Sequence, residues 1–173
     1  MAVNVIASPI NLSWSNFQVV DSSPDLSGDE VAQVHPEMRM PPNVQVANSN
    51  GVFRLNAFTI TVAPVPQDTI VLRSATQTAD LLRHEQGHYD LLILVAKAMA
   101  RDLGAATGSS AGALNTQVQT IQQTHNANAQ AIDRAYDTQT DHGKDSLQQT
   151  SWNQAIAAAL GNPAASTVRG LSL

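Results

Sequence analysis

An α+β fold is predicted for this chain of 173 residues, with strands in the first part and helices in the second. Short runs of β-branched and aromatic residues, separated by Pro, Gly and Asn, fill residues 1–73. From residue 74 onward, apolar residues recur at spacings of three and four, the period of an amphipathic helix. The length and the absence of a repeat favour one domain over residues 1–173. We expect it to be strand-rich over 1–73, helical over 74–160 and loose over 161–173.

The strand-rich part begins with short β-prone runs and contains one hairpin signal. The candidate strands lie at residues 4–6 and 17–20, in a hairpin over 44–58, and at 58–62 and 69–73. Asn50-Gly51 is the expected turn of the hairpin, because both residues tolerate the positive φ angles of a type I′ turn. Residues 21–43 are rich in Ser, Pro, Asp and Asn and are predicted to form an irregular connection.

Three helices are predicted to follow. They are expected at about residues 74–103, 114–136 and 145–160. Ser74 or Thr76 would cap the first helix, and Gly104 would end it. The segment DTQTDHG, residues 137–143, interrupts the helical pattern between the second and third helices. We therefore expect a turn there that brings the chain back over the first helix.

Composition excludes several classes of function. The formal net charge is −5, and the nine Lys and Arg residues form no basic run, which argues against nucleic acid and anionic membranes as partners. Without cysteine there is no disulfide, thiol nucleophile or cysteine-ligated metal. No apolar run approaches transmembrane length, so no membrane insertion is expected. Residues 1–14 lack the features of a signal peptide, which fits a cytoplasmic protein, export by another route, or a signal already removed.

The segment HEQGHYD, residues 84–90, contains candidate metal ligands and a candidate general base. His84 and His88 are four residues apart, so on a helix both imidazoles can point at one Zn2+ ion. Glu85 lies at the edge of that face and can reach a zinc-bound water without ligating the metal, as in the H-E-x-x-H arrangement. Zinc lowers the pKa of its water to about 7, and the carboxylate moves the proton to the leaving amine. The motif predicts a zinc-dependent metallopeptidase that hydrolyses a peptide or protein substrate.

Four sequence blocks resemble one bacterial family of unknown function, DUF922, whose members are described as zinc-dependent proteases on the strength of their motif. The blocks are LSWSNFQ (12–18), LLRHEQGHYDLL (81–92), YDTQTDHG (136–143) and LQQTSWNQAI (147–156). They occur in the family's order and cover most of the chain. The resemblance implies a zincin-like domain. In such a domain a small sheet from the first half packs on the metal-binding helix, and two further helices follow.

A catalytic zinc needs a third protein ligand from a distant segment. The family's Thr-x-His-Gly block matches at Thr140, His142 and Gly143, so the resemblance favours His142, with a ring nitrogen about 2.0–2.1 Å from zinc. Asp137 and Asp141 lie in the same segment and are expected behind the ligands, hydrogen-bonded to a ligating imidazole. Either of them is also an alternative ligand, because the aspzincin proteases have an Asp ligand in a distantly similar layout. His125, on an apolar stripe, is the remaining candidate.

Two residues near the motif have competing interpretations. Tyr136 is a candidate donor to the developing oxyanion, but an aromatic residue at helical spacing more often packs in the core. Gly87 weakens the helix by about 1 kcal/mol relative to Ala, which suggests that another part of the backbone approaches it closely.

A strand between Phe53 and Val62 is the candidate edge for an extended peptide substrate.

Two other functional classes fit the same sequence. One is a catalytically silent zinc-binding or protein-interaction module on the same fold. The other is a helical adaptor without metal, in which His84 and His88 are ordinary residues of an amphipathic helix. Metal content separates the adaptor from the other two, and peptide turnover separates the protease from the silent module. The sequence favours no oligomeric state.

Overall fold

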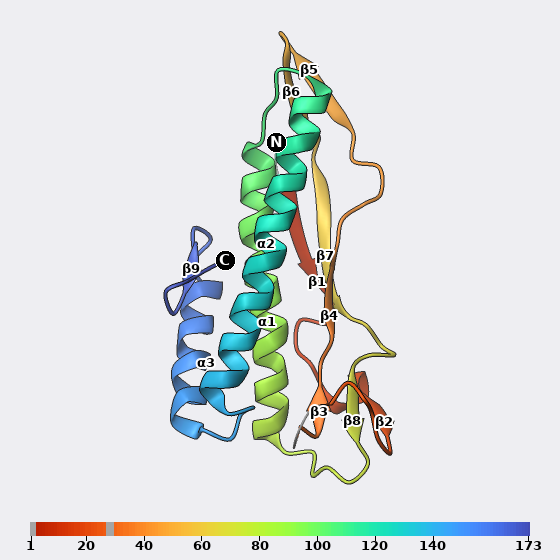
Figure 1. Cartoon of the computed structure of the whole chain (residues 1–173), viewed down its shortest axis with the longest axis vertical. Coiled ribbons are helices and arrows are strands. Elements are labelled where there is room, and N and C mark those ends of the chain that lie inside the picture. The colour runs from red at the N-terminus through yellow and green to blue at the C-terminus, as the bar shows by residue number, and fades with distance from the viewer. Residues whose placement is uncertain (1–2, 27–29) are drawn as a thin grey trace.

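The computed structural model describes residues 3–26 and 30–173, and it confirms the α+β class. Within these residues there are three α-helices: α1 (Ala79–Ala105), α2 (Ala111–Thr140) and α3 (Ser146–Leu160). The strands of residues 3–72 lie on one side of α1, whereas α3 and the short C-terminal strands lie on the other (Figure 1). None of these helices combines the length and apolar character needed to cross a bilayer.

Two three-stranded sheets and two hairpins contain the strands of the described residues. The first sheet has the order β1 (Val3–Ala7), β7 (Phe58–Pro64), β4 (Pro36–Arg39), with β1 parallel and β4 antiparallel to β7. The second sheet has the order β2 (Gln18–Val20), β8 (Ile70–Leu72), β3 (Ala32–Gln33). The hairpins are β5 (Val46–Ser49) with β6 (Val52–Leu55), and β9 (Thr167–Val168) with β10 (Leu171–Ser172).

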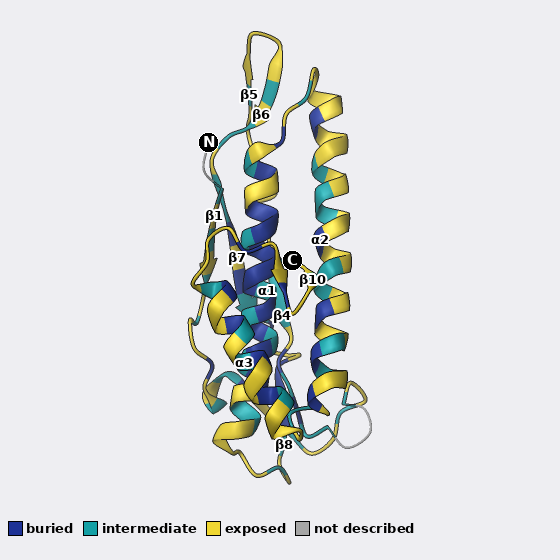
Figure 2. Cartoon of the chain, turned by 90° about the vertical axis from the view of Figure 1, so that its left-hand side faces the viewer, coloured by how far each residue is buried: buried dark blue, intermediate teal, exposed yellow. Residues whose placement is uncertain are grey.

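Helix α1 is the central element of the molecule. Its apolar run is buried on both sides, and it is the darkest helix in Figure 2. Tyr89 and Met99 pack toward the first sheet, whereas Leu94 and Val95 pack toward α2 and α3 around Trp152. A helix that is apolar all round is buried all round. Because α1 is held from both sides, the motif in its N-terminal half sits on a rigid support.

The hairpin and the third helix are confirmed, whereas both predicted ends of the first helix are wrong. Asn50 and Gly51 have φ angles of 51° and 79°, as the turn requires. Helix α1 begins after Thr78, whose hydroxyl accepts a hydrogen bond from the Leu81 N–H at 3.1 Å. The predicted stop at Gly104 lies inside the helix. One glycine does not end a helix whose neighbours are held by packing on both sides.

The irregular connection predicted for residues 21–43 is wrong in its second half. It contains β3 and β4, which pair with β8 and β7, while its residues 27–29 lie outside the described residues. Pro36 is compatible with β4 because it occupies the first position of the strand. Long-range pairing outweighs the local turn signals here, and it places residues 30–38 across from α1.

The tail predicted to be loose is also ordered. Residues 161–173 contain the β9–β10 hairpin, and Val168 and Leu173 are buried against α2 and α3. The guanidinium of Arg101 donates hydrogen bonds to the carbonyls of Pro163 and Ala165. Arg169 stacks over Trp152, with its guanidinium carbon 5.1 Å from the ring centroid. Burial of a few apolar side chains is therefore enough to hold this segment.

The predicted edge strand needs correction. β7, which contains the second half of the stretch from Phe53 to Val62, is the central strand of its sheet and is paired on both sides. β6 pairs with β5, and Phe53 bridges to Gly108 in the connection between α1 and α2. The open edge that faces the helices belongs to β4, which pairs only with β7 among the described strands.

Candidate metal centre

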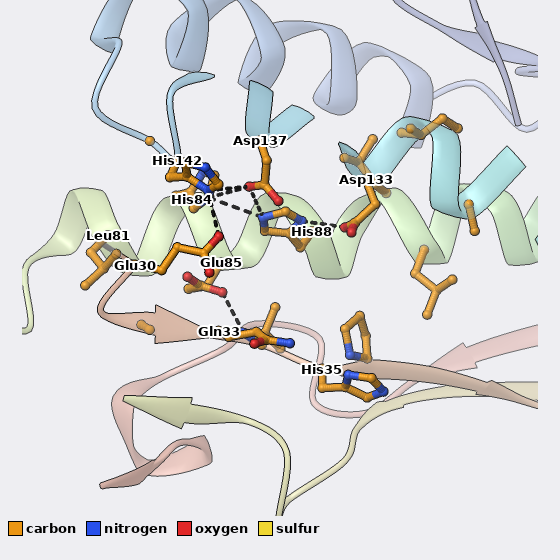
Figure 3. Close-up of a pocket in the computed structure, with 18 of the residues that line it drawn as sticks. Glu30, Gln33, His35, Leu81, His84, Glu85, His88, Asp133, Asp137 and His142 are labelled. Atoms are coloured by element: carbon orange, nitrogen blue, oxygen red, sulfur yellow. Dashed lines mark hydrogen bonds and ion pairs between the residues drawn. The ribbon is translucent and has the colours of Figure 1, made fainter. Parts of the chain in front are cut away.

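The two motif histidines meet a carboxylate from α2 (Figure 3). The Nε2 atoms of His84 and His88 are 3.2 Å apart. The Oδ1 atom of Asp137 lies 3.2 Å from the first nitrogen and 2.9 Å from the second. Donor atoms bonded to one tetrahedral zinc at about 2.0–2.1 Å lie roughly 3.3 Å from one another. The three atoms therefore have nearly the spacing of ligands around such an ion.

Hydrogen bonds behind the rings orient both histidines. The Nδ1 atom of His84 lies 3.1 Å from Oε1 of Gln149, and that of His88 lies 2.6 Å from Oδ1 of Asp133. An amide oxygen and a carboxylate accept hydrogen bonds, so each Nδ1 carries the donated proton. Each Nε2 then faces the centre of the group, where its deprotonated form would bind a metal ion. Support of this kind is typical of metal-ligating histidines.

The charges of the metal-free group favour a cation at its centre. Burial acts to lower the pKa of His88, but hydrogen bonds and charge from Asp133 and Asp137 outweigh it and raise that pKa to about 10. Burial acts to raise the pKa of Asp137, but hydrogen bonds from His84 and His88 outweigh it and lower that pKa. The two carboxylates thus favour positive charge at this position.

Glu85 lies beside this group and is held in place by the strand segment opposite. Its side chain is almost fully buried, and Oε2 accepts a hydrogen bond of 2.6 Å from the Val34 N–H. Burial raises the pKa of the Glu85 carboxyl above its ordinary value, although the nearby His88 and His84 act to lower it. Glu85 nevertheless lines the same cleft as the two histidines. The structure therefore holds a buried carboxyl group beside the two imidazoles, within the cleft.

A cleft of about 1000 Å³ contains the group. Residues of α1 form its floor, residues 30–38 form one wall, and α2 with the turn at 142–144 forms the other. Carboxyl groups dominate its charged lining. Among the described residues these are Asp25, Glu30, Glu37, Asp80, Glu85, Asp133 and Asp137, against one lysine, Lys144.

His142 does not join the two motif histidines in this arrangement. Its Nδ1 atom lies 2.9 Å from Oε1 of Glu30 and 3.6 Å from Oδ1 of Asp137. The potential ligand atoms of His142, Glu30 and Asp137 form a group of their own, next to the group of His84, His88 and Asp137. The structure thus brings Asp137, rather than His142, between the two Nε2 atoms.

The length of α2 explains why Asp137, rather than His142, lies next to the two motif histidines. The helix was expected to end near Tyr136 but continues through Thr140, so Asp137 projects from its last regular turn toward α1. The tight turn comes afterward, with φ angles of 48°, 51° and 82° at Asp141, His142 and Gly143. Asp141 is exposed at the helix end, which contradicts its predicted place behind a ligand. A Cβ on Gly143 would lie 3.0 Å from the His84 side chain, so this turn does pass over α1.

The structure places Tyr136 in the core, so its predicted oxyanion role stays a prediction without support. Tyr136 is fully buried behind the histidines, with its ring stacked on His84 at 4.9 Å between centroids. Its hydroxyl donates to the His84 carbonyl at 3.1 Å and accepts from Gln149 Nε2 at 2.6 Å. The hydroxyl is thus engaged in two hydrogen bonds, and Tyr136 is not among the residues that line the cleft. The alternative interpretation, that this aromatic residue packs in the core, is confirmed.

Gly87 is required by a side chain rather than by a neighbouring backbone. A Cβ at this position would clash with the Tyr136 hydroxyl and lie 2.5 Å from its Cζ atom. We expect Gly87→Ala to destabilise the protein by about 1–3 kcal/mol, because overpacking outweighs the gain in helix propensity. Urea unfolding followed by circular dichroism measures this. Gly112→Ala is the matched control, since only Ser110 Oγ, at 3.8 Å, lies near its Cβ. A Gly87→Ala variant as stable as the wild type would contradict the packing argument.

Two other candidates lie away from the centre. Nε2 of His125 lies 2.8 Å from Oδ2 of Asp102, which is about 21 Å farther along α1 than His88 at 1.5 Å per residue. His125 is therefore not the third ligand. Asp90 accepts a hydrogen bond from Gln86 Nε2 at 2.7 Å, on the side of α1 where Gln86 also binds the Leu12 N–H.

Three residues of the site, Asp133, Gln149 and Glu30, were missed from the sequence. Asp133 and Asp137 form an i,i+4 pair on α2 that matches the i,i+4 pair of histidines on α1, and this spacing was visible in the sequence. Gln149 lies in the Gln- and Trp-containing block of α3, where nothing marked its contact with His84. Glu30 lies in a segment whose position depends on long-range strand pairing, so no local signal could have identified it.

Residues 59–143, just under half of the chain, match the family model described as a bacterial protein of unknown function (DUF922). This match supports the resemblance found in the sequence, from β7 through α1 and α2 to the turn at Gly143. No curated protein and no solved structure matches the chain. The family description names no activity, so function must be argued from the site itself.

Proposed function

We propose that this protein is a zinc-dependent metallopeptidase with His84, His88 and Asp137 as its zinc ligands. The observation that carries the proposal is the meeting of two Nε2 atoms and one carboxylate oxygen within 3.2 Å of one another, beside a buried glutamate in a cleft. Two imidazoles and a carboxylate are a known ligand set for catalytic zinc. Asp137 therefore takes the ligand role for which the sequence favoured His142.

The fit of these residues to zinc rests on the orientation of both rings. Asp133 and Gln149 accept the Nδ1 protons, which leaves both Nε2 atoms free to bind a metal. When bound, zinc supplies a Lewis acid that polarises the carbonyl of the scissile peptide and makes water a better nucleophile at neutral pH. The acidic lining of the cleft favours a divalent cation over an anion at this position.

Glu85 is the proposed general base and acid. It takes a proton from the attacking water as the water adds to the peptide carbonyl, and it returns the proton to the leaving nitrogen. Burial favours the return of the proton, because it raises the pKa of the carboxyl above its ordinary value. The hydrogen bond from the Val34 N–H fixes one carboxylate oxygen while the other can face the cleft.

The substrate is proposed to bind as an extended chain along β4. This strand lines the cleft through Pro36, Glu37 and Met38, and its outer edge has no strand partner among the described residues. An extended peptide can add to such an edge through main-chain hydrogen bonds. The peptide would then run between β4 and α2, across the face of α1 that carries Glu85.

The test combines metal analysis with peptide cleavage. The purified protein is expected to hold at least one zinc per chain and to cleave members of a broad peptide library, read by mass spectrometry. A chelator should abolish cleavage, and added zinc should restore it, because metal-ligand sites must be filled for activity. Zinc binding without cleavage in the whole library would favour the silent zinc-binding module. Failure to bind zinc at all would refute the proposal.

A further inference from the structure

A second group of potential metal ligands adjoins the first. It comprises Glu30 from the segment before β3, Asp137 from α2 and His142 from the turn after α2. His142 Nδ1 lies 2.9 Å from Glu30 Oε1 and 3.6 Å from Asp137 Oδ1, and these two distances bracket the roughly 3.3 Å expected between ligands of one tetrahedral ion. The group combines three segments that are far apart in the sequence.

Asp137 is common to both groups. A carboxylate has two oxygens with four lone-pair sites, so it can bind two cations at once. A carboxylate between two imidazole-containing groups is therefore suited to bridge two ions about 3.5–4 Å apart, as in two-metal sites. Four carboxyl groups, those of Glu30, Glu85, Asp133 and Asp137, lie around the two groups. Their negative charge is better balanced by two divalent ions than by one.

We propose that the protein binds a second divalent metal ion through Glu30, His142 and the shared carboxylate of Asp137. The proposal rests on the zinc site proposed above, because that site supplies the other half of the bridge. It also gives a role to His142, which lies beside the first group but outside it. Two carboxylates and one imidazole form a harder ligand set than that of the first site, so manganese as well as zinc can occupy it.

The second site is expected to bind its ion more weakly than the first. The side chain of His142 is 35% exposed and that of Glu30 is 19% exposed, whereas that of His84 is only 4% exposed. An exposed site keeps its ligands and its ion better hydrated, so less is gained when they combine. Occupation would tie the segment before β3 to the α2–α3 turn and so hold together two walls of the cleft.

Zinc titration of the full-length protein tests the proposal. Metal-free protein is dialysed against increasing zinc, and bound zinc is counted by elemental analysis. The wild type is expected to bind two zinc ions, one tightly and one at higher free zinc. Glu30→Gln and His142→Ala should each bind only the tight one. Glu37→Gln and His35→Ala are the matched controls, because they remove a carboxylate and an imidazole at the same cleft from outside both groups.

Each alternative result identifies what fails. Saturation of the wild type at one zinc, retained in His142→Ala, overturns the second site and leaves the first intact. Loss of that single zinc in His142→Ala overturns the second site and makes His142 a ligand of the first ion. Complete absence of zinc overturns both proposals. Loss of the weaker ion in the two control variants as well would mark it as adventitious. A zinc-soaked crystal should show two anomalous peaks about 3.5–4 Å apart.

Discussion

Glu85→Gln is expected to lower the rate of peptide hydrolysis by about 100- to 10,000-fold while zinc content and fold stay unchanged. Glutamine has nearly the same shape, and its amide oxygen can still accept the hydrogen bond from the Val34 N–H. It cannot accept the proton of the attacking water. The effect should therefore fall on kcat, with KM nearly unchanged, because the lost interaction belongs to the transition state.

Steady-state kinetics on a peptide found in the library screen measures this change, and elemental analysis checks the zinc. Asp80→Asn is the control, since Asp80 lines the same cleft outside β4 and forms an exposed ion pair with Arg83 at 2.7 Å. It is expected to change kcat by less than about twofold, in line with the small energies of exposed pairs. Peptide hydrolysis at the wild-type rate in Glu85→Gln would contradict the proposed mechanism.

Asp137→Ala is expected to weaken the tight zinc site by more than about 100-fold. Loss of a residue that only supports a ligand already lowers metal affinity by about 10- to 100-fold. Asp137 is proposed as a ligand itself, so its loss should lower zinc affinity further. Asp133→Asn provides that comparison directly. It should weaken zinc binding by about 10- to 100-fold, because Asp133 contacts His88 through Nδ1 only. Competition with a chromophoric chelator measures both affinities.

His125→Ala is the control for the zinc measurements, because His125 pairs with Asp102 far from the centre. It should bind zinc as the wild type does. Circular dichroism establishes that each variant is folded. Full zinc affinity in folded Asp137→Ala would remove Asp137 from the coordination sphere. If His142→Ala then lost the zinc, the ligand favoured by the family resemblance would be restored.

The approach of the two motif histidines could be predicted because it depends on local geometry. A helix places residues four apart on one face, so the approach of His84 and His88 followed from their spacing alone. The hairpin turn at Asn50-Gly51 was predictable for the same reason, since the positive φ angles are a property of those two residues. The change from strands to helices near residue 74 was equally visible in the hydrophobic period.

The choice between Asp137 and His142 was not local. It depends on whether α2 ends before or after Thr140, and helix ends are decided by packing as much as by propensity. Tyr136 and Thr140 are both fully buried, against α1 and α3, and this burial extends the helix beyond its predicted end. One more helical turn brings Asp137 to the imidazoles and moves His142 into the following turn.

The sequence by itself determined the α+β class, the pair of imidazoles and the glutamate between them, because each follows from the period of a helix or strand. Only the tertiary structure decided which carboxylate faces the pair, which side chains orient the rings and which strand edge borders the cleft. Those features depend on the distance between α1, α2 and residues 30–38, which pack together through contacts between residues far apart in the chain. Local patterns do not specify such distances, since they result from how buried side chains of different elements fill the space between them.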